Sequence, residues 1–306
     1  MSFKTIFFSC LSWSRWSLNR YTGLAKVLSK GVAIGSLAIL FVACDDDSGS
    51  SVGPENEVEL AESSSSQTVI LSSDSHEEPS GTSFNGWSWD VPKKFRLNPE
   101  IAYGAMTDSR DGKTYKTVKI GNQTWMAENL NYDDSVTTTS LMDESWCYND
   151  VAANCDVGGR LYSWRAAVDY KKNGCGSGPI CLTSLPVQGI CPEGWHLPDS
   201  TEWNTLFTAV GGASTAGIML KSRSGWNDYE GKNGNGTDAY GFSALPAGDR
   251  YSNGFCTNEG RNAIFWSASE MDHSNAYYMY LYNDHDYGAL DSYFKSKGHS
   301  VRCVKN

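Results

Sequence analysis

The segment 275–294 combines aromatic and small polar side chains in a way that favours molecular recognition. Seven Tyr or Phe residues lie there among Asn, Asp, His and Ser: Tyr277, Tyr278, Tyr280, Tyr282, Tyr287, Tyr293 and Phe294. Tyrosine offers rigid contact area, and small polar residues offer adaptable hydrogen bonds. Rings beside Asn and Asp also suit sugars. We predict ligand contacts from five residues of this segment: Tyr278, Tyr280, Tyr282, Asp284 and Asp286.

The alternation of side chains along a strand predicts which of these tyrosines face outward. Two sets of residues alternate here: Tyr278, Tyr280 and Tyr282 in the first, and Tyr277, Met279 and Leu281 in the second. The second set is more apolar and should face the core, which leaves the first set for ligand or solvent. The sequence leaves an alternative open, in which one tyrosine face is buried and the other is merely wet.

Oxygen-bearing side chains in a Gly-rich loop indicate a candidate cation site. They are Asn227, Asp228, Asn233, Asn235 and Asp238. Oxygen ligands on alternate residues suit calcium, so calcium is the cofactor that the sequence suggests. A solvated Asn/Gly turn loop would explain the same pattern, and this alternative also stays open.

The sequence lacks the common motifs of catalysis. It contains no GxSxG, no HExxH and no phosphate-binding glycine loop. We interpret His196 as a structural hydrogen-bonding residue, and Glu128 and Glu202 as caps or buried acceptors. We therefore predict that the protein is not an enzyme and has no catalytic residues.

Composition and charge narrow the classes of partner. The chain has 306 residues, of which 40% are hydrophobic and 12% aromatic, so it can fill a core. Its net charge of −10 argues against a nucleic-acid binder, which normally has a basic face. Residues 45–81 hold ten Asp or Glu and no Lys or Arg, so the acidity belongs to this segment.

The N-terminus is typical of a secreted, lipid-anchored protein. Residues 1–30 carry five basic side chains and no acid, and an uncharged apolar stretch follows at 31–43. This is the pattern of a secretory signal peptide. Cys44 directly after Phe41, Val42 and Ala43 resembles a bacterial lipobox, which implies lipidation of Cys44. Ordinary cleavage near Ala43, with Cys44 as a spare thiol, is the alternative.

These features predict three regions and a place in the cell. Residues 1–43 are a lipoprotein signal peptide, 44–83 a disordered Ser-rich acidic tether, and 84–306 one folded domain. The lipid chains would attach the protein to a membrane, because each buried CH₂ contributes ~0.8 kcal/mol. We expect a cell-envelope location, at the outer membrane and exposed on the cell surface.

Local patterns place the main elements of the domain. Runs at 114–120 and 123–126, joined by Gly and Asn, predict a hairpin. Apolar spacing predicts a helix over 159–169 and a second helix that begins after Asp199 with a capping box and ends at Gly211. The best strands after residue 225 are 265–266, 276–282 and 300–304. Two helices followed by a half rich in strands and loops indicate an α+β fold.

Six blocks of sequence carry a resemblance to a known family. They are 111–121 (DGKTYKTVKIG) with 125–131 (WMAENLN), 159–164 (GRLYSW), 191–198 (CPEGWHLP) with Glu202 and Trp203, 241–248 (GFSALPAG), 265–267 (FWS) and 300–303 (SVRC). In this order they resemble the Fibrobacter major paralogous domain, a family of secreted and lipid-anchored bacterial proteins, over about residues 98–306.

The resemblance implies a C-type-lectin-like α+β fold, which formylglycine-generating enzymes also use. The activity of the family is largely undefined, so the resemblance implies a fold and not a function. From the tyrosine-rich segment and the missing catalytic motifs we expect non-catalytic recognition of carbohydrate or protein at the cell surface. A structural envelope protein without a diffusible ligand is the first alternative. A formylglycine-generating-enzyme-like oxidoreductase is the second, but it would need a reactive Cys pair near the last strand, where Cys303 stands alone.

The cysteines suit an oxidising compartment. Without Cys10 in the signal and Cys44 at the lipid, seven remain, and the sequence cannot fix their pairing. Loop size and the fold resemblance favour three disulfides: Cys147–Cys155, Cys175–Cys181 and, as in lectin-like folds, Cys191–Cys303. Cys256 is left over.

Overall fold

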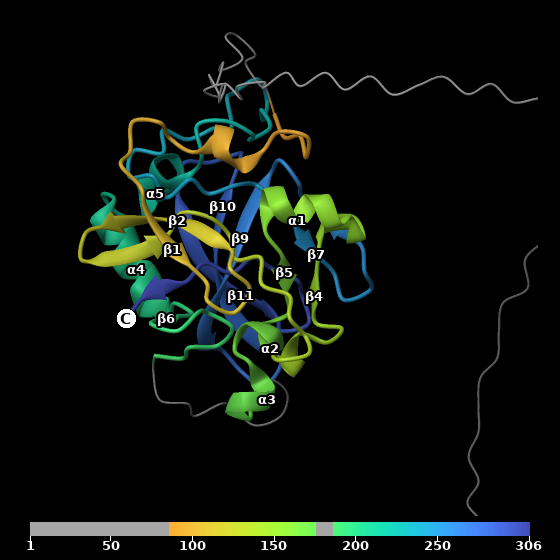
Figure 1. Cartoon of the computed structure of the whole chain (residues 1–306). Coiled ribbons are helices and arrows are strands. Elements are labelled where there is room, and N and C mark those ends of the chain that lie inside the picture. The colour runs from red at the N-terminus through yellow and green to blue at the C-terminus, as the bar shows by residue number, and fades with distance from the viewer. Residues whose placement is uncertain (1–85, 176–185) are drawn as a thin grey trace, which may run out of the picture. The chain divides into compact units, whose positions relative to one another are not determined.

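The computed structural model describes residues 86–175 and 186–306 (Figure 1). The predicted signal peptide, Cys44 and the predicted tether lie outside these residues, as does Cys181. Within the described ranges, no helix combines the length and the apolar character needed to cross a membrane.

The described residues form the mixed α+β fold that the sequence predicts. The helices are α1 Ala152–Gly158, α2 Trp164–Ala167, α3 Tyr170–Asn173, α4 Ser200–Ala209 and α5 Ala213–Leu220, with 3-10 helices η1 Lys93–Arg96, η2 Thr139–Leu141 and η3 Tyr148–Asp150. The strands are β1 Gly104–Thr107, β2 Thr114–Ile120, β3 Gln123–Met126, β4 Ser145–Trp146, β5 Leu161–Tyr162, β6 Trp195–His196, β7 Asp249–Arg250, β8 Cys256–Thr257, β9 Asn262–Glu270, β10 Asn275–Tyr282, β11 Gly288–Phe294 and β12 Val304–Lys305.

Two sheets organise the described part of the chain. The first has the strand order β1-β2-β3-β12-β6, so the last strand lies in its interior. The second is the antiparallel sheet β11-β10-β9, and two short hairpins, β4-β5 and β7-β8, accompany it. Helices α4 and α5 contact the second sheet, and Figure 1 shows them on the opposite side of β9 and β10 from α1.

The predicted hairpin and the predicted capped helix are confirmed. Strands β2 and β3 pair in antiparallel register, with Ile120 opposite Gln123 at the turn. At the start of α4, the Asp199 side chain accepts a hydrogen bond from the Glu202 backbone N–H at 2.8 Å. The Glu202 side chain in turn accepts one from the Asp199 N–H at 3.0 Å. These two bonds satisfy backbone donors that a helix leaves unpaired at its first turn.

The predicted helix at 159–169 is wrong in its first half. Residues Leu161–Tyr162 are strand β5, whose Tyr162 N–H donates to the carbonyl of His299 at 2.8 Å. The helix begins only at Trp164, where the Ser163 side chain caps it by accepting from the Ala166 N–H. The apolar spacing fitted a helix because a strand followed by a short helix buries the same positions.

Both faces of the β9–β10–β11 sheet are covered by apolar side chains. Met279 and Leu281 belong to the cluster that includes α4, α5 and the stacked pair Trp125 and Trp203, whose ring centroids lie 4.7 Å apart. The opposite face packs in a second cluster, which includes the helix α2 and the strands β3 and β6. The prediction that Met279 and Leu281 face the core is confirmed.

Two of the three predicted disulfides are present among the described residues. Cys147 bonds to Cys155, and Cys191 bonds to Cys303. The second bond closes the chain over a sequence separation of 112 residues. Cys175 is also disulfide-bonded, but Cys181 lies outside the described residues. Cys256 is a buried free thiol.

Candidate functional site

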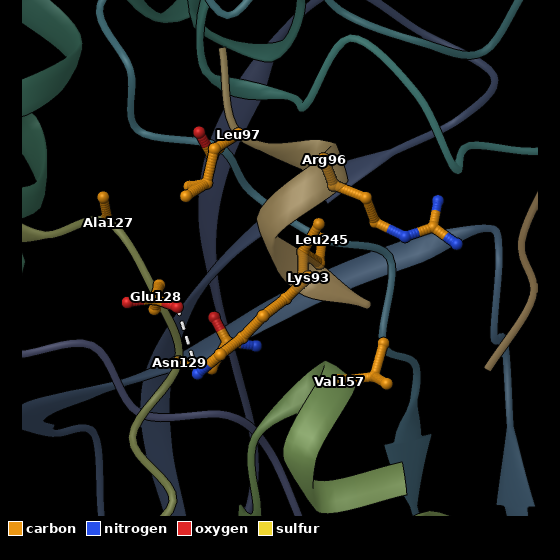
Figure 2. A pocket seen from close by; sticks show the side chains of 9 residues that line it. Lys93, Arg96, Leu97, Ala127, Glu128, Asn129, Val157 and Leu245 are labelled. Carbon is orange, nitrogen blue, oxygen red and sulfur yellow. Dashed lines mark ion pairs between the residues drawn. The ribbon is translucent and has the colours of Figure 1, made fainter. Parts of the chain in front are cut away.

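A small pocket lies beside the second half of the first sequence block, between η1 and α1 (Figure 2). Its lining residues are Lys93, Arg96, Leu97, Ala127, Glu128, Asn129, Val157, Ser243 and Leu245. Glu128 pairs with Lys93 at 3.0 Å and also accepts the backbone N–H of Lys116. The pocket has room for about one water molecule. Its carboxylate is therefore occupied by structural partners, as the sequence interpretation of Glu128 expected.

Asn129 connects its own segment to α1 and to the C-terminal segment of the chain, behind this pocket. Its side-chain NH₂ donates to the Gly158 carbonyl at 2.7 Å and to the Ser300 hydroxyl at 3.2 Å. Its side-chain oxygen accepts from the Arg302 Nε at 2.8 Å. All of these groups are buried, so each bond satisfies a polar atom that water cannot reach.

Arg302 is fully buried and extends the same network. Its guanidinium donates to the backbone carbonyls of Phe242 and Ser243 and lies over the Phe242 ring at 4.4 Å. Burial lowers the pKa of Arg302 to about 9, while nearby Asp238 opposes that shift. Asp238 bonds through both carboxylate oxygens to Ser243, and burial raises its pKa to about 6. We call Asn129, Asp238, Ser243 and Arg302 the buried polar network.

Four of the five predicted calcium ligands accept hydrogen bonds from within the chain. Asn227 accepts the Trp87 backbone N–H at 3.0 Å, and Asn235 accepts that of Trp226 at 2.9 Å. Asn233 accepts a hydrogen bond from the Asn235 N–H, and Asp238 belongs to the buried polar network. Asp228 is exposed. No group of three or more His, Cys, Asp or Glu able to hold a metal occurs within residues 86–175 and 186–306. Calcium binding stays a prediction.

His196 has both ring nitrogens engaged. Its Nε2 lies 2.8 Å from the Glu202 carboxylate, and its Nδ1 lies 2.6 Å from the Asn306 side-chain oxygen. Burial lowers the pKa of His196, but the bonds to Glu202 and Asn306 outweigh it, so that the net pKa is raised. This histidine ties the last residue to the first turn of α4, which fits the structural role that we expected.

Four aromatic side chains gather at the far end of β10 and in the turn to β11. Tyr280 and Tyr282 stack with ring centroids 4.5 Å apart, and His285 and Tyr287 stack at 3.5 Å. The two pairs meet edge-on, with Tyr280 6.5 Å from Tyr287. Tyr280, Tyr282 and His285 are half-buried and Tyr287 is exposed. We call these four residues the aromatic surface.

Tyr278 does not share this exposure, which corrects the prediction that it faces ligand or solvent. It is 7% exposed, and its ring packs 5.3 Å from that of His299. The chain after β11 crosses this face: Lys295 bonds to the Ser274 carbonyl and Gly298 pairs with Arg250. The His299 ring therefore covers Tyr278, whereas Tyr280 and Tyr282 on the same face stay half-buried.

A buried lysine holds the turn that carries Asp284 and Asp286. Lys221, at the end of α5, donates to the carbonyls of Tyr282 and His285, each at 3.1 Å. Burial lowers the pKa of Lys221, and the charges of Asp284 and Asp286 oppose that shift. Both aspartates are exposed beside the aromatic surface, where the sequence placed them.

Sequence reasoning missed a second aromatic pair beside this surface. The Lys297 ammonium lies 3.3 Å from the ring centre of Tyr251 and 5.0 Å from that of Tyr293. It also pairs with Asp249 at 2.6 Å. Burial raises the pKa of Tyr282 to about 12, and the charges of Tyr280 and Asp249 add to that rise. Tyr251 was overlooked because it lies in a hairpin outside the tyrosine-rich segment, 24 residues before Asn275. We call Tyr251 and Tyr293 the lysine-flanking tyrosines.

Comparison with known families decides the relationship. Residues 118–305 match the model of the Fibrobacter succinogenes major domain. The chain belongs to this family. No curated protein and no solved structure matches it.

The sequence blocks of this Fibrobacter succinogenes major domain converge on the buried polar network. Asn129 comes from the first block, Ser243 from 241–248, and Arg302 from 300–303. The aromatic surface, by contrast, lies outside all six blocks. The motifs that make the family recognisable therefore supply contacts that hold the fold, and the exposed aromatic residues lie elsewhere.

Proposed function

We propose that the protein is a lipid-anchored binding module of the cell envelope that recognises carbohydrate or protein without catalysis. The observation that carries this proposal is the aromatic surface. Stacked rings that remain half-exposed keep apolar area in contact with water, and covering that area with a ligand releases the water.

The polar groups around the aromatic surface support recognition of hydroxyl-rich ligands. Burial and the neighbouring Tyr287 and Asp291 raise the pKa of Tyr280, so its phenol stays protonated and can donate a hydrogen bond. Asp284, Asp286 and Asp291 are exposed and can accept hydrogen bonds. Surfaces that combine tyrosine with small polar residues bind ligands by this pairing of rigid area with adaptable bonds.

The proposed fold type is C-type-lectin-like. The α+β architecture and the Cys191–Cys303 bond between the segment before α4 and the last strand support it. In such a scaffold the strands and the disulfide hold the shape, while surface residues bind. The position of the aromatic surface at a strand end and in a turn agrees with that division.

The proposed anchor is tested at Cys44. The Cys44→Ala variant should lose incorporation of radiolabelled fatty acid, because the thiol that would be acylated is gone. Cys256→Ala is the matched control, since that thiol is buried in the folded domain. Equal labelling of the Cys44 variant and the parent protein would contradict lipidation and remove the proposed membrane attachment.

The binding proposal is tested by a glycan-array screen of the full-length protein. Retention on a subset of glycans is expected for the parent and for Tyr240→Ala, which removes an exposed tyrosine remote from the aromatic surface. Tyr280→Ala should weaken that retention about tenfold. Retention of every variant alike would reject the aromatic surface. Retention of nothing by the parent would favour a structural envelope protein without a diffusible ligand.

A further inference from the structure

A positive charge near the aromatic surface, that of Lys297, is closed off from ligands. Lys297 is 7% exposed, and its ammonium is covered by the Tyr251 and Tyr293 rings and neutralised by Asp249. An ammonium has three donors, and here one faces a carboxylate while the rings cover the rest. Lys297 therefore holds the two tyrosines in place but offers nothing to an incoming anion.

The accessible charge around the surface is negative. Asp284, Asp286 and Asp291 are exposed, whereas the nearby lysines Lys221 and Lys297 are buried. Burial raises the pKa of Tyr280, and the neighbouring Tyr287, Asp291 and Asp284 add to that rise. A ligand that carries carboxylate or sulfate groups would meet like charge here, which opposes binding. An uncharged ligand meets no such repulsion and can bond to the carboxylates and to the tyrosine phenols.

The lysine-flanking tyrosines give this face a second place for stacking. In the β10–β11 register Ala289 lies opposite Tyr280, and Tyr293 lies opposite Ala276. Ala289 and Tyr293 are four residues apart on β11, so their side chains share one face about 14 Å from each other. Tyr293 and Tyr251 are each 40% exposed. The two aromatic positions are too far apart for one small ring to touch both.

We propose that this face binds an extended chain of uncharged sugars, which stacks at the aromatic surface and again at the lysine-flanking tyrosines. Asp291 lies on β11 between Ala289 and Tyr293, where its carboxylate can accept hydrogen bonds from sugar hydroxyls. The inference rests on the proposed binding function and names the class of ligand for it.

The test measures how affinity depends on chain length. Isothermal titration of the full-length protein uses neutral β-linked gluco-, xylo- and manno-oligosaccharides from two to six units. The parent should bind six units at least tenfold more tightly than two units of the same sugar, because the longer chain reaches both aromatic positions. Affinity that does not change with length would overturn the proposal.

Variants of Tyr293 separate the second position from the first. Tyr293→Ala should lower affinity for six units about tenfold and leave that for two units unchanged. Tyr293→Phe keeps the ring over Lys297 and should bind as the parent does, which controls for loss of folding. Tyr240→Ala is the matched control, because this exposed tyrosine lies outside the β9–β10–β11 sheet. Equal effects of Tyr293→Ala on both lengths would contradict the two-position account.

Charged ligands and Tyr280→Ala complete the test. Binding of polygalacturonate or of a protein, with no binding of neutral oligosaccharides, would overturn the choice of ligand. If Tyr280→Ala weakens that binding, the proposed function survives while this inference fails. If Tyr280→Ala leaves all binding intact, the proposed function fails with it.

Discussion

The buried polar network and the aromatic surface differ in how they use polar and aromatic residues: the network buries them, and the surface leaves them partly exposed. In the network, Arg302 is 0% exposed and gives its donors to Asn129 and to two backbone carbonyls. At the aromatic surface, Tyr280 and Tyr282 stack on each other and remain half-exposed. The first region has little capacity left for a ligand, whereas the second keeps rings and phenols available.

The scaffold residues and the proposed binding residues therefore come from different segments of the chain. A buried arginine requires acceptors at fixed positions, so it constrains several segments of the chain at once. An exposed tyrosine constrains only its own strand and can be exchanged without disturbing the fold. The blocks that carry the resemblance to the family therefore supply scaffold contacts, and we propose that ligand contacts lie outside them.

The largest expected effect comes from the disulfide that closes the scaffold. The double variant Cys191→Ala/Cys303→Ala should lose ~4–5 kcal/mol of unfolding free energy, as expected for a loop of about a hundred residues in the chain-entropy model. The control Cys147→Ala/Cys155→Ala opens a separation of only 8 residues and should lose ~2–3 kcal/mol. Urea unfolding measures both. A smaller loss of unfolding free energy for the Cys191/Cys303 variant than for the control would contradict the assignment of this disulfide to the scaffold.

The next effect is expected at the centre of the buried polar network. Arg302→Met removes a charged donor and leaves three acceptors unpaired in the interior, so unfolding free energy should fall by ~3 kcal/mol or more. Arg223→Met is the control, because this exposed arginine forms a surface ion pair with Glu100 and a bond to the Asn98 side chain and should cost less than ~1 kcal/mol. Equal losses in the two variants would mean that the network contributes no more than a surface pair.

A pH effect of intermediate size is expected from Asp238. Burial raises its pKa to about 6 in the folded protein, above the ordinary value of 3.8. The folded state therefore binds the proton more tightly, and this stabilisation is present below pH ~4 and lost as the pH rises to ~6. The unfolding free energy of the parent, minus that of Asp238→Asn, should fall by ~1 kcal/mol per pH unit across this window. A difference that is flat or that rises with pH would contradict the burial of this carboxyl.

The parts of the fold that the sequence predicted depend on local signals. The β2–β3 hairpin has a Gly-Asn turn, and α4 has its capping box, so neighbouring residues alone determine them. The sequence predicted two helices, whereas the described residues form five. It missed the short helices α1 and α3, and it missed α5 because Gly211 and Gly212 end one helix and the next begins at Ala213. It also missed β11, a sparsely apolar edge strand, and the predicted strand at 300–304 is reduced to Val304–Lys305.

The candidate site was also predicted only where a local pattern determines it. Alternation along β10 correctly placed Met279 and Leu281 in the core. It failed for Tyr278, because the segment that covers this residue comes from beyond β11 and contains Lys295 and Lys297, which do not look like a cover in sequence. A contact between distant segments leaves no local pattern, and the same holds for Tyr251.

The smallest effect on stability is expected at the aromatic surface. Tyr280→Ala and Tyr282→Ala remove half-exposed rings, so each should change unfolding free energy by only ~1 kcal/mol. Tyr278→Ala, in contrast, opens a cavity in the core and should cost ~3 kcal/mol or more. Thermal or urea unfolding of the three variants, measured side by side, tests whether exposure divides these tyrosines as the structure does.

The most direct test of the division between scaffold and binding surface measures unfolding free energy and ligand retention on the same samples of two variants. Tyr280→Ala should weaken retention on the cognate glycan about tenfold and leave stability within ~1 kcal/mol of the parent. Arg302→Met, measured where it is still folded, should show the reverse, with a large loss of stability and unchanged retention. A large stability loss with unchanged retention in Tyr280→Ala would assign this tyrosine to the core and contradict the account.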